Sequence, residues 1–292
     1  MHLRIGQIHC RRLAVLRSGD GKMRSIGLIR SLLAIFSIAM MLSGLVSARD
    51  IAAITASRTL VVAVPNVQTP PFFFEENGEL KGLDIDLAKA IAESLGVRAV
   101  FNREARSFNE AVQLVERGRA DIAVAKISRT LPRAQTVLFT EPYIVLPHAL
   151  LVNRLRFAEI ARGRPIERVL QDFSGSIGVI ANSAFVGYAR VNFPKAAVME
   201  FPSWEAVIEA VTTGKVTAAY RDAFEAKRIF KIRPQLSLAV RSVVIEDVTD
   251  TIGIAVGAGQ YHLHNYINLF LVQRNIKYTT DQILTRYEKH LQ

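Results

Sequence analysis

The sequence is poor in cysteine and tryptophan, with one of each among 292 residues. A single cysteine, Cys10, cannot form an internal disulfide bond or a zinc site built on several cysteines. Cys10 also lies in a segment that we expect to be removed, so the mature chain would lack a cysteine nucleophile. These absences exclude disulfide-stabilised folds and cysteine-based catalysis.

Other chemical motifs are missing as well. The chain has no Gly-x-Ser-x-Gly and no His-Glu-x-x-His pattern, and it has neither a P-loop nor a cluster of metal-ligating residues. We therefore expect no metal, no cofactor and no hydrolase activity.

The positive charge is concentrated near the N-terminus. The whole chain has 37 Lys and Arg against 26 Asp and Glu, a net charge of +11. Seven of these basic residues and one acid lie in residues 1–48, which leaves 30 and 25 in the remainder, or +5. This modest charge, without a run of Lys or Arg, argues against nucleic-acid binding.

Residues 1–48 are predicted to be a secretory signal peptide. Arg24 and Arg30 precede an apolar stretch, Ser31–Leu42, and small residues end at Ala48, where we expect cleavage. Met23 is then a candidate for the true start. The alternative is an uncleaved membrane anchor, although the apolar stretch is short for a bilayer-spanning helix. A cleaved leader predicts a periplasmic protein.

Two later segments repeat one plan. Ser107-Phe108 stands eleven residues before Gly118-Arg119, and Ser203-Trp204 stands eleven residues before Gly214-Lys215. Each segment predicts a serine N-cap, an amphipathic helix, a glycine stop and a buried strand. Ser107 and Glu110 also match a capping box. The repeat predicts two similar α/β lobes.

The repeat also aligns two charged residues. Its offset places Lys126 opposite Asp222, each just past the carboxyl end of a predicted strand. Ligands of open α/β sheets bind at such strand ends. The expected lobes are residues 49–147 with 248–292, and residues 148–247. Two extended crossings, residues 143–153 and 243–256, are predicted to form a double-stranded hinge.

Three segments resemble a known family. They are Pro70–Phe74 with Asn77–Leu87, Ala120–Ala125 continuing to Tyr143, and Trp204–Asp222. In order and spacing they resemble the periplasmic amino-acid-binding proteins of ABC importers, solute-binding family 3. The resemblance implies an α/β fold of the type II periplasmic-binding-protein kind, with two Rossmann-like lobes joined by a two-stranded hinge.

The resemblance also implies a ligand site. Arg133 and Ser128 match the residues that bind the ligand carboxylate, and Asn182-Ser183 matches a helix start that binds it through backbone N–H groups. Asp222 matches the acid that binds the ammonium. Each residue also has an alternative interpretation without a ligand. Arg133 would be a surface arginine, Ser128 would hydrogen-bond to its own backbone, and Ser183 and Asp222 would only cap their helices.

Several positions depart from the family pattern. Thr69 stands where the family has an aromatic residue, Asn66 replaces a frequent acid, and Asn182 replaces a glycine. With Phe72, Asn66 and Thr69 are expected at the mouth of the site. Lys126 replaces a small residue.

Lys126 has three possible roles. Its ammonium extends to solvent, binds an acidic ligand side chain, or takes the place of the ligand's ammonium, in which case the ligand is a carboxylate without an amine.

The predicted function is a monomeric binding protein that closes on an amino acid or related small carboxylate and presents it to an ABC permease. One alternative is an enzyme on the same scaffold, of the cyclohexadienyl dehydratase type. It would need an acid or base in the cleft, for which Lys126, His148 and Asp222 are the candidates. A second alternative is a ligand-sensing subunit. The binding-protein reading needs no catalytic residue.

Overall fold

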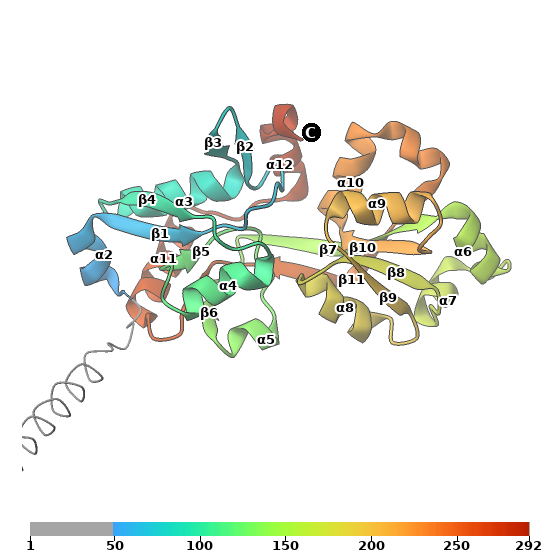
Figure 1. Ribbon diagram of the computed structural model, residues 1–292, viewed down its shortest axis with the longest axis horizontal. Helices are drawn as coiled ribbons and strands as arrows, with labels where there is room; N and C mark the ends of the chain where they lie inside the picture. Colours follow the sequence, from blue (N-terminus) through green and yellow to red (C-terminus); the bar gives the residue numbers. More distant parts are fainter. Residues whose placement is uncertain (1–48, 292) are drawn as a thin grey trace, which may run out of the picture. The chain divides into compact units, whose positions relative to one another are not determined.

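The computed structural model describes residues 49–291, so the predicted signal peptide lies outside the described residues. The described part contains two five-stranded sheets, with strand orders β4-β1-β5-β12-β6 and β11-β7-β10-β8-β9 (Figure 1). We call the half built on the first sheet lobe 1 and the half built on the second sheet lobe 2.

Lobe 1 has a mixed sheet. Strand β1 is parallel to β4 and β5, whereas β12 is antiparallel to β5 and β6. The strands of lobe 1 are β1 (Thr59–Ala63), β4 (Arg98–Asn102), β5 (Ile122–Ala123), β6 (Val137–Phe139) and β12 (Ala255–Gly257), with a hairpin of β2 (Phe74–Glu76) and β3 (Glu79–Lys81). Its helices are α2 (Ile51–Ser57), α3 (Leu83–Ser94), α4 (Phe108–Glu116), α5 (Leu131–Ala134), α11 (Tyr261–Gln273), α12 (Thr280–Arg286) and the short η2 (Glu288–His290).

Lobe 2 is built in the same way. Strand β8 is parallel to β9 and β10, and β7 is antiparallel to β10 and β11. The strands are β7 (Ile144–Asn153), β8 (Ser176–Ile180), β9 (Ala197–Phe201), β10 (Ala218–Asp222) and β11 (Val240–Ile252). The helices are α6 (Arg154–Ala161), α7 (Ile166–Gln171), α8 (Ala184–Asn192), α9 (Trp204–Thr212), α10 (Ala223–Ile232) and η1 (Pro234–Leu238).

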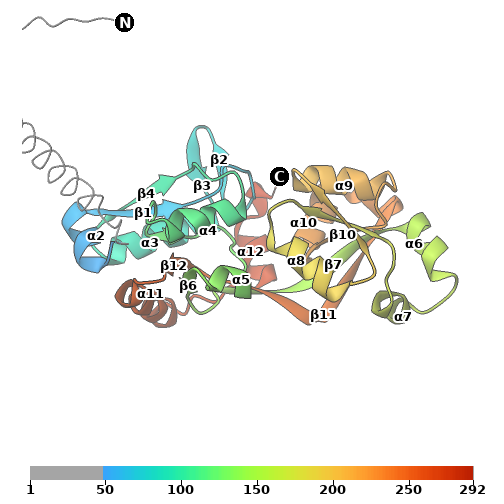
Figure 2. The same cartoon turned by 60° about the horizontal axis from the view of Figure 1, so that its bottom comes forward.

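The two lobes are joined by β7 and β11, which pair antiparallel from Ile144–Ile252 to Asn153–Val240 (Figures 1 and 2). Their register shifts between Ile245 and Thr249. The predicted hinge is therefore present as two long paired strands. The predicted lobe limits, 147/148 and 247/248, fall at this shift and remain predictions.

The sequence repeat corresponds to equivalent structures. Ser107 Oγ accepts a hydrogen bond from the Glu110 N–H at 3.2 Å, and Ser203 Oγ accepts one from the Ala206 N–H at 3.2 Å. Gly118 and the matching Gly214 both have positive φ, 66° and 75°. In both lobes the capped helix, α4 or α9, is thus followed by a turn that favours glycine.

The predicted capping box is only half formed. The Glu110 carboxylate accepts from the N–H of Arg106 at 2.8 Å rather than from the N–H of Ser107. The hydrogen bond from the Glu110 N–H to Ser107 Oγ is therefore present, whereas the Glu110 side chain holds the backbone of Arg106, the residue before the N-cap.

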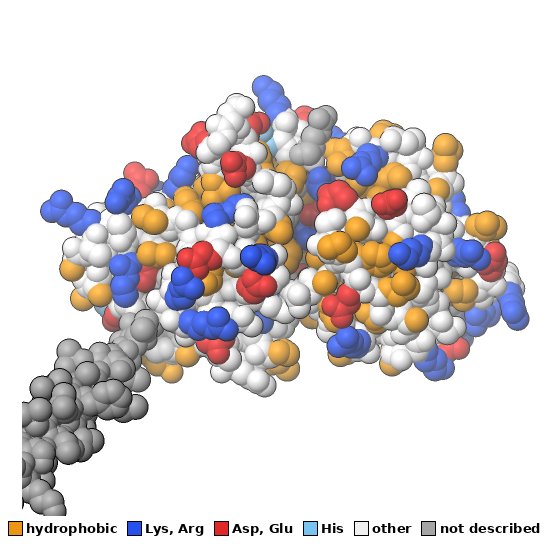
Figure 3. Space-filling model, viewed as in Figure 1, with side chains coloured by type: hydrophobic (Ala, Val, Ile, Leu, Met, Phe, Trp, Pro, Cys, Tyr) orange, Lys and Arg blue, Asp and Glu red, His pale blue; other side chains and the backbone are white. Residues whose placement is uncertain are grey.

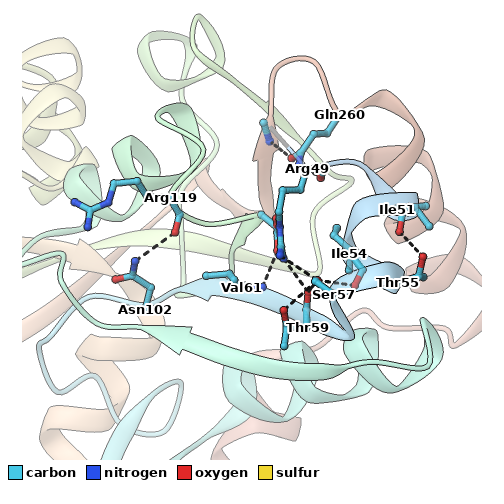
Figure 4. Close-up of polar contacts among 12 residues, drawn as sticks. Arg49, Ile51, Ile54, Thr55, Ser57, Thr59, Val61, Asn102, Arg119 and Gln260 are labelled. Carbon is cyan, nitrogen blue, oxygen red and sulfur yellow. Dashed lines mark hydrogen bonds and ion pairs between the residues drawn. The ribbon is translucent and has the colours of Figure 1, made fainter. Parts of the chain in front are cut away.

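The start of the described chain is tied to the first sheet (Figure 4). The Arg49 guanidinium donates to both carboxylate oxygens of Asp121, at 3.0 and 2.6 Å, and to the carbonyl of Thr59 at 2.8 Å. Asp121 also accepts the N–H of Val61 at 2.7 Å. The acid in the Ala120-Asp121-Ile122 motif is therefore structural: it fixes β1 beside the segment that leads into α2.

No helix within residues 49–291 is long and apolar enough to cross a membrane. On the face drawn in Figure 3, Lys and Arg side chains are interspersed with Asp and Glu, so this face carries no broad patch of one sign. That distribution agrees with the low net charge of the chain after residue 48.

Candidate functional site

The contact between Lys126 and Asp222 joins the two lobes. Lys126 follows β5 of lobe 1, Asp222 ends β10 of lobe 2, and Lys126 Nζ lies 2.9 Å from Asp222 Oδ2. Both side chains are buried. The pairing that the repeat predicts is therefore present, and the reading in which Lys126 extends to solvent is wrong.

Asp222 has a second role in the same place. Its Oδ1 accepts the N–H of Glu225 at 3.1 Å, so Asp222 is the N-cap of α10. Arg221 Nε lies 3.6 Å from Asp222 Oδ2. The cap fixes the carboxylate while the other oxygen faces the cations.

Glu225 and Arg228 extend the network, and neither was predicted as a site residue. Glu225 Oε1 lies 3.0 Å from Lys126 Nζ, and Glu225 Oε2 accepts from Arg228 Nε at 2.9 Å. Arg228 in turn donates to the carbonyl of Leu291 at 2.7 Å. Burial alone would raise the pKa of Glu225, but the charges of Lys126 and Arg228 lower the pKa below its ordinary value.

Aromatic rings enclose this ion pair. Lys126 Nζ lies 4.6 Å from the ring centroid of Phe72 and 5.3 Å from that of Phe224. The two rings pack edge to face at 5.0 Å, which brings α10 against the core of lobe 1. Lys126 itself has φ 49°, a left-handed conformation that glycine adopts without strain. The backbone at this position is therefore held by its surroundings.

Arg133 is a buried guanidinium that makes no direct contact with an acid. It is 8% exposed and follows the Thr130 N-cap of α5. It donates to the carbonyl of Ser128 at 2.8 Å and to Asn109 Oδ1 at 3.1 and 2.8 Å. Within residues 49–291, no carboxylate oxygen lies within 4.0 Å of it. Burial lowers the pKa of Arg133 from its ordinary value.

Asp250 lies beside this arginine and was also missed. It comes from the hinge strand β11, is 1% exposed, and accepts hydrogen bonds from Ser128 Oγ at 2.8 Å and Tyr188 OH at 3.2 Å. Burial, against the lowering effect of the Ser128 hydrogen bond and with a smaller contribution from the charge of Asp222, raises the pKa of Asp250 to about 7. Asp250 thereby connects lobe 1, the hinge and lobe 2.

These groups border one small cavity. Its volume is about 20 Å³, which accommodates a water molecule but not an amino acid. The predicted residues that line it are Lys126, Ser128, Arg133, Ser183 and Asp222, together with Phe108, Ala184, Phe185, Arg221 and Asp250. Because Ser183 begins α8, the positive end of that helix faces the cavity.

A second, larger cavity adjoins the first along Phe108 and Arg221, which line both. Its volume is about 530 Å³, within the range of small-molecule sites. Thr69 lines this cavity, as do Trp204 and Arg228. The guanidinium carbon of Arg221 lies 5.4 Å from the Trp204 ring centroid.

Three predicted residues, Asn66, Phe72 and Asn182, line neither cavity. Asn66 is exposed, accepts from Arg103 at 3.1 Å and lines neither cavity. Phe72 is fully buried behind Lys126 rather than at a mouth. Asn182 is exposed with φ 55°, a conformation that glycine and asparagine tolerate best, which accounts for asparagine where the family has glycine. Ser183 donates to the carbonyl of Ile180 at 2.7 Å and makes no side-chain cap.

His148 is part of the core of lobe 2. Its ring packs against Phe185, Tyr188 and Tyr220, and Nδ1 is hydrogen-bonded to Tyr220 OH. Burial lowers its pKa to about 4, so the ring is neutral at pH 7. It lines neither cavity, which agrees with a structural role.

No group of three or more metal-ligating side chains gathers within residues 49–291. The residues that line the small cavity include charged and hydrogen-bonding side chains, among them Lys126 just after strand β5 and Asp222 at the end of strand β10.

Comparison with known proteins identifies the family. The model of the bacterial extracellular solute-binding proteins, family 3, matches residues 60–290. The chain belongs to this family. Its fold is the two-lobe fold of type II periplasmic binding proteins, as the sequence predicted.

Individual relatives include binding proteins and an enzyme. The arginine-binding periplasmic protein of Mannheimia haemolytica is 26% identical over 57% of this chain and 63% of its own length. The cyclohexadienyl dehydratase of Pseudomonas aeruginosa is 28% identical over 63% of this chain and 66% of the enzyme. The chain thus spans just under two thirds of the length of each of these two relatives.

The matches to solved structures cover nearly the whole length of those proteins. An ancestral amino-acid-binding protein, a precursor of cyclohexadienyl dehydratase, has a TM-score of 0.65 at 25% identity over 81% of this chain and 98% of that chain. An ancestral arginine-binding protein bound to arginine has a TM-score of 0.61 at 28% identity, over 78% and 97%.

The raised pKa of Asp250 predicts a pH-dependent stability. The unfolded carboxyl titrates near pH 4, so between about pH 4 and 7 the folded protein retains a proton that the unfolded chain has lost. The free energy of unfolding should therefore fall as the pH rises through this window, on the order of 3 kcal/mol more in the wild type than in Asp250→Asn. Urea unfolding at several pH values measures this difference.

The exposed Asp172, which pairs with Lys195, provides the control. Asp172→Asn should follow the wild-type pH profile. Parallel profiles for the wild type and Asp250→Asn would contradict the assignment.

Proposed function

We propose that this chain is a periplasmic binding protein that closes on an amino acid or related small carboxylate and delivers it to an ABC transporter. The observation that carries the proposal is the buried guanidinium of Arg133, whose hydrogen bonds go to neutral acceptors, beside a cavity at the start of α8. Buried charges are stabilised by a partner of opposite charge, and a ligand carboxylate supplies one with a planar, bidentate geometry.

Hinge closure follows from the origin of the lining residues. Arg133 and Ser128 belong to lobe 1, whereas Ser183 and Asp222 belong to lobe 2. A ligand that contacts both sets binds the closed form better than the open form, and this difference in affinity drives closure. The paired strands β7 and β11 connect the lobes through the motion.

The relatives support the same proposal. Proteins with similar sequences carry the names of periplasmic binding proteins for arginine and of ABC-transporter binding proteins for glutamine. Export through a cleavable signal peptide, a monomeric state and delivery to an inner-membrane permease complete the proposal. A ligand-sensing subunit would differ only in the partner that reads the closed form.

Replacing the guanidinium tests the binding role. Arg133→Met should reduce affinity about 100-fold for the tightest ligand found in a thermal-shift screen of amino and organic acids, because a bidentate charged pair is lost. Isothermal titration calorimetry measures the affinity. Arg129→Met is the matched control, because Arg129 lines neither cavity. Undiminished affinity in Arg133→Met would contradict the proposal.

An enzyme on this scaffold remains the second candidate, favoured by one observation. Asp250 lines the small cavity and its pKa is raised to about 7, a value suited to a general acid. The three residues predicted for catalysis are less suited: Lys126 and Asp222 neutralise each other, and His148 lies in the core.

We expect no dehydratase activity. Incubation of the wild type with prephenate should form product no faster than buffer alone, as followed by absorbance. Product formation that disappears in Asp250→Asn would establish the enzyme instead.

A further inference from the structure

The protein supplies its own ammonium group at the place where an amino acid would bring one. Lys126 Nζ lies 2.9 Å from Asp222 Oδ2 and 3.0 Å from Glu225 Oε1, and Lys126 as a residue is 5% exposed. An ammonium has three donors, of which these two carboxylates take two, and the faces of Phe72 and Phe224 stabilise the charge further. Two of the three donors of the Lys126 ammonium are therefore engaged, and the aromatic rings cover the charge.

The carboxylate of Asp222 is equally occupied. Oδ2 faces Lys126 and Arg221, and Oδ1 accepts the N–H of Glu225. A ligand ammonium would have to displace a buried lysine whose other partner is Glu225. Displacing Lys126 would break its buried contact with Asp222 and leave Glu225 as its one carboxylate partner, and breaking a buried ion pair is costly.

The charges around Asp222 also disfavour another cation. Two acids, Asp222 and Glu225, face three bases, Lys126, Arg221 and Arg228. Asp250 and Arg133, which also line the small cavity, add one acid and one base and leave this excess of bases unchanged. This balance is positive beside Asp222, so a ligand ammonium would be the fourth cation around two carboxylates, whereas an anion would lower the excess.

The volumes of the two cavities also disfavour an ammonium group beside Asp222. The cavity beside Arg133 and Asp222 has a volume of about 20 Å³, whereas the adjoining cavity beside Trp204 and Arg221 has about 530 Å³. A ligand with its carboxylate on Arg133 would therefore extend away from Lys126 into the larger cavity. There the lining includes the apolar residues Ile180 and Ile229.

We infer that the ligand of this cleft is a carboxylate without an α-ammonium group, because Lys126 takes the place of that group on Asp222 and Glu225. The inference rests on the proposed function and narrows its ligand class. Lys126 is then the residue that determines specificity against α-amino acids.

Matched pairs of probes test the inference by calorimetry: L-phenylalanine with L-phenyllactate, L-glutamate with L-2-hydroxyglutarate, and L-leucine with L-2-hydroxyisocaproate. Each pair differs only in an amine or a hydroxyl on the α-carbon. The wild type should bind at least one hydroxy acid about tenfold or more tightly than its amino acid, the size expected for one charged contact.

Two variants at one position separate space from charge. Lys126→Gly removes the ammonium, suits the φ of 49° and opens room beside Asp222, so it should gain affinity for the amino acids by about tenfold or more. Lys126→Met removes the charge but still fills the space, so it should not gain this affinity. Thermal unfolding of both variants verifies that they fold.

The outcomes distinguish the inference from the proposed function. Tighter binding of the amino acids than of the hydroxy acids by the wild type overturns the inference and leaves the binding function intact. A gain of amino-acid binding in Lys126→Gly supports the inference, even where the wild type binds none of the probes. Absence of binding by the wild type and by a folded Lys126→Gly overturns both.

Discussion

The buried contact of Lys126 with Asp222 and Glu225 is the interaction on which the closed arrangement of the lobes depends. It joins the end of β5 in lobe 1 to the end of β10 and the first turn of α10 in lobe 2. The chain of contacts continues through Arg228 to the carbonyl of Leu291, so the C-terminal segment of lobe 1 is also fastened to α10. Figures 1 and 2 both show α12 beside α10.

Such a network is better suited to selecting a ligand than to stabilising a fold. Removing charges from water costs nearly as much as their attraction returns, so a buried ion pair adds little net stability, whereas breaking one is costly. The left-handed backbone of Lys126 adds a local cost that a glycine would not have. A strained, buried lysine between two acids is therefore more readily explained by a role in the site than by one in the core.

The sequence predicted the elements that obey a strong local pattern. The repeat located α4, α9 and their capping serines, and its offset brought Lys126 to Asp222. Two kinds of feature could not be found in this way. Helices α6 and α7 lie on the surface with little apolar periodicity, and Asp250 reaches the site only because β11 crosses between the lobes. Glu225 did have a signal, three residues after its N-cap, but a capping pattern does not indicate a contact with another lobe.

The distance between the lobes without ligand is the most direct test of this account. Residues 49–291 contain no cysteine, so spin labels can be attached at the exposed positions Glu79 in lobe 1 and Glu209 in lobe 2, with Cys10 replaced by serine. Electron–electron double resonance on the ligand-free protein should give a larger population at short distance for the wild type than for Lys126→Gly, and a bound ligand should move the remaining wild-type molecules to the short distance. A ligand-free wild type with the same long distances as Lys126→Gly would contradict the claim that this lysine holds the lobes together.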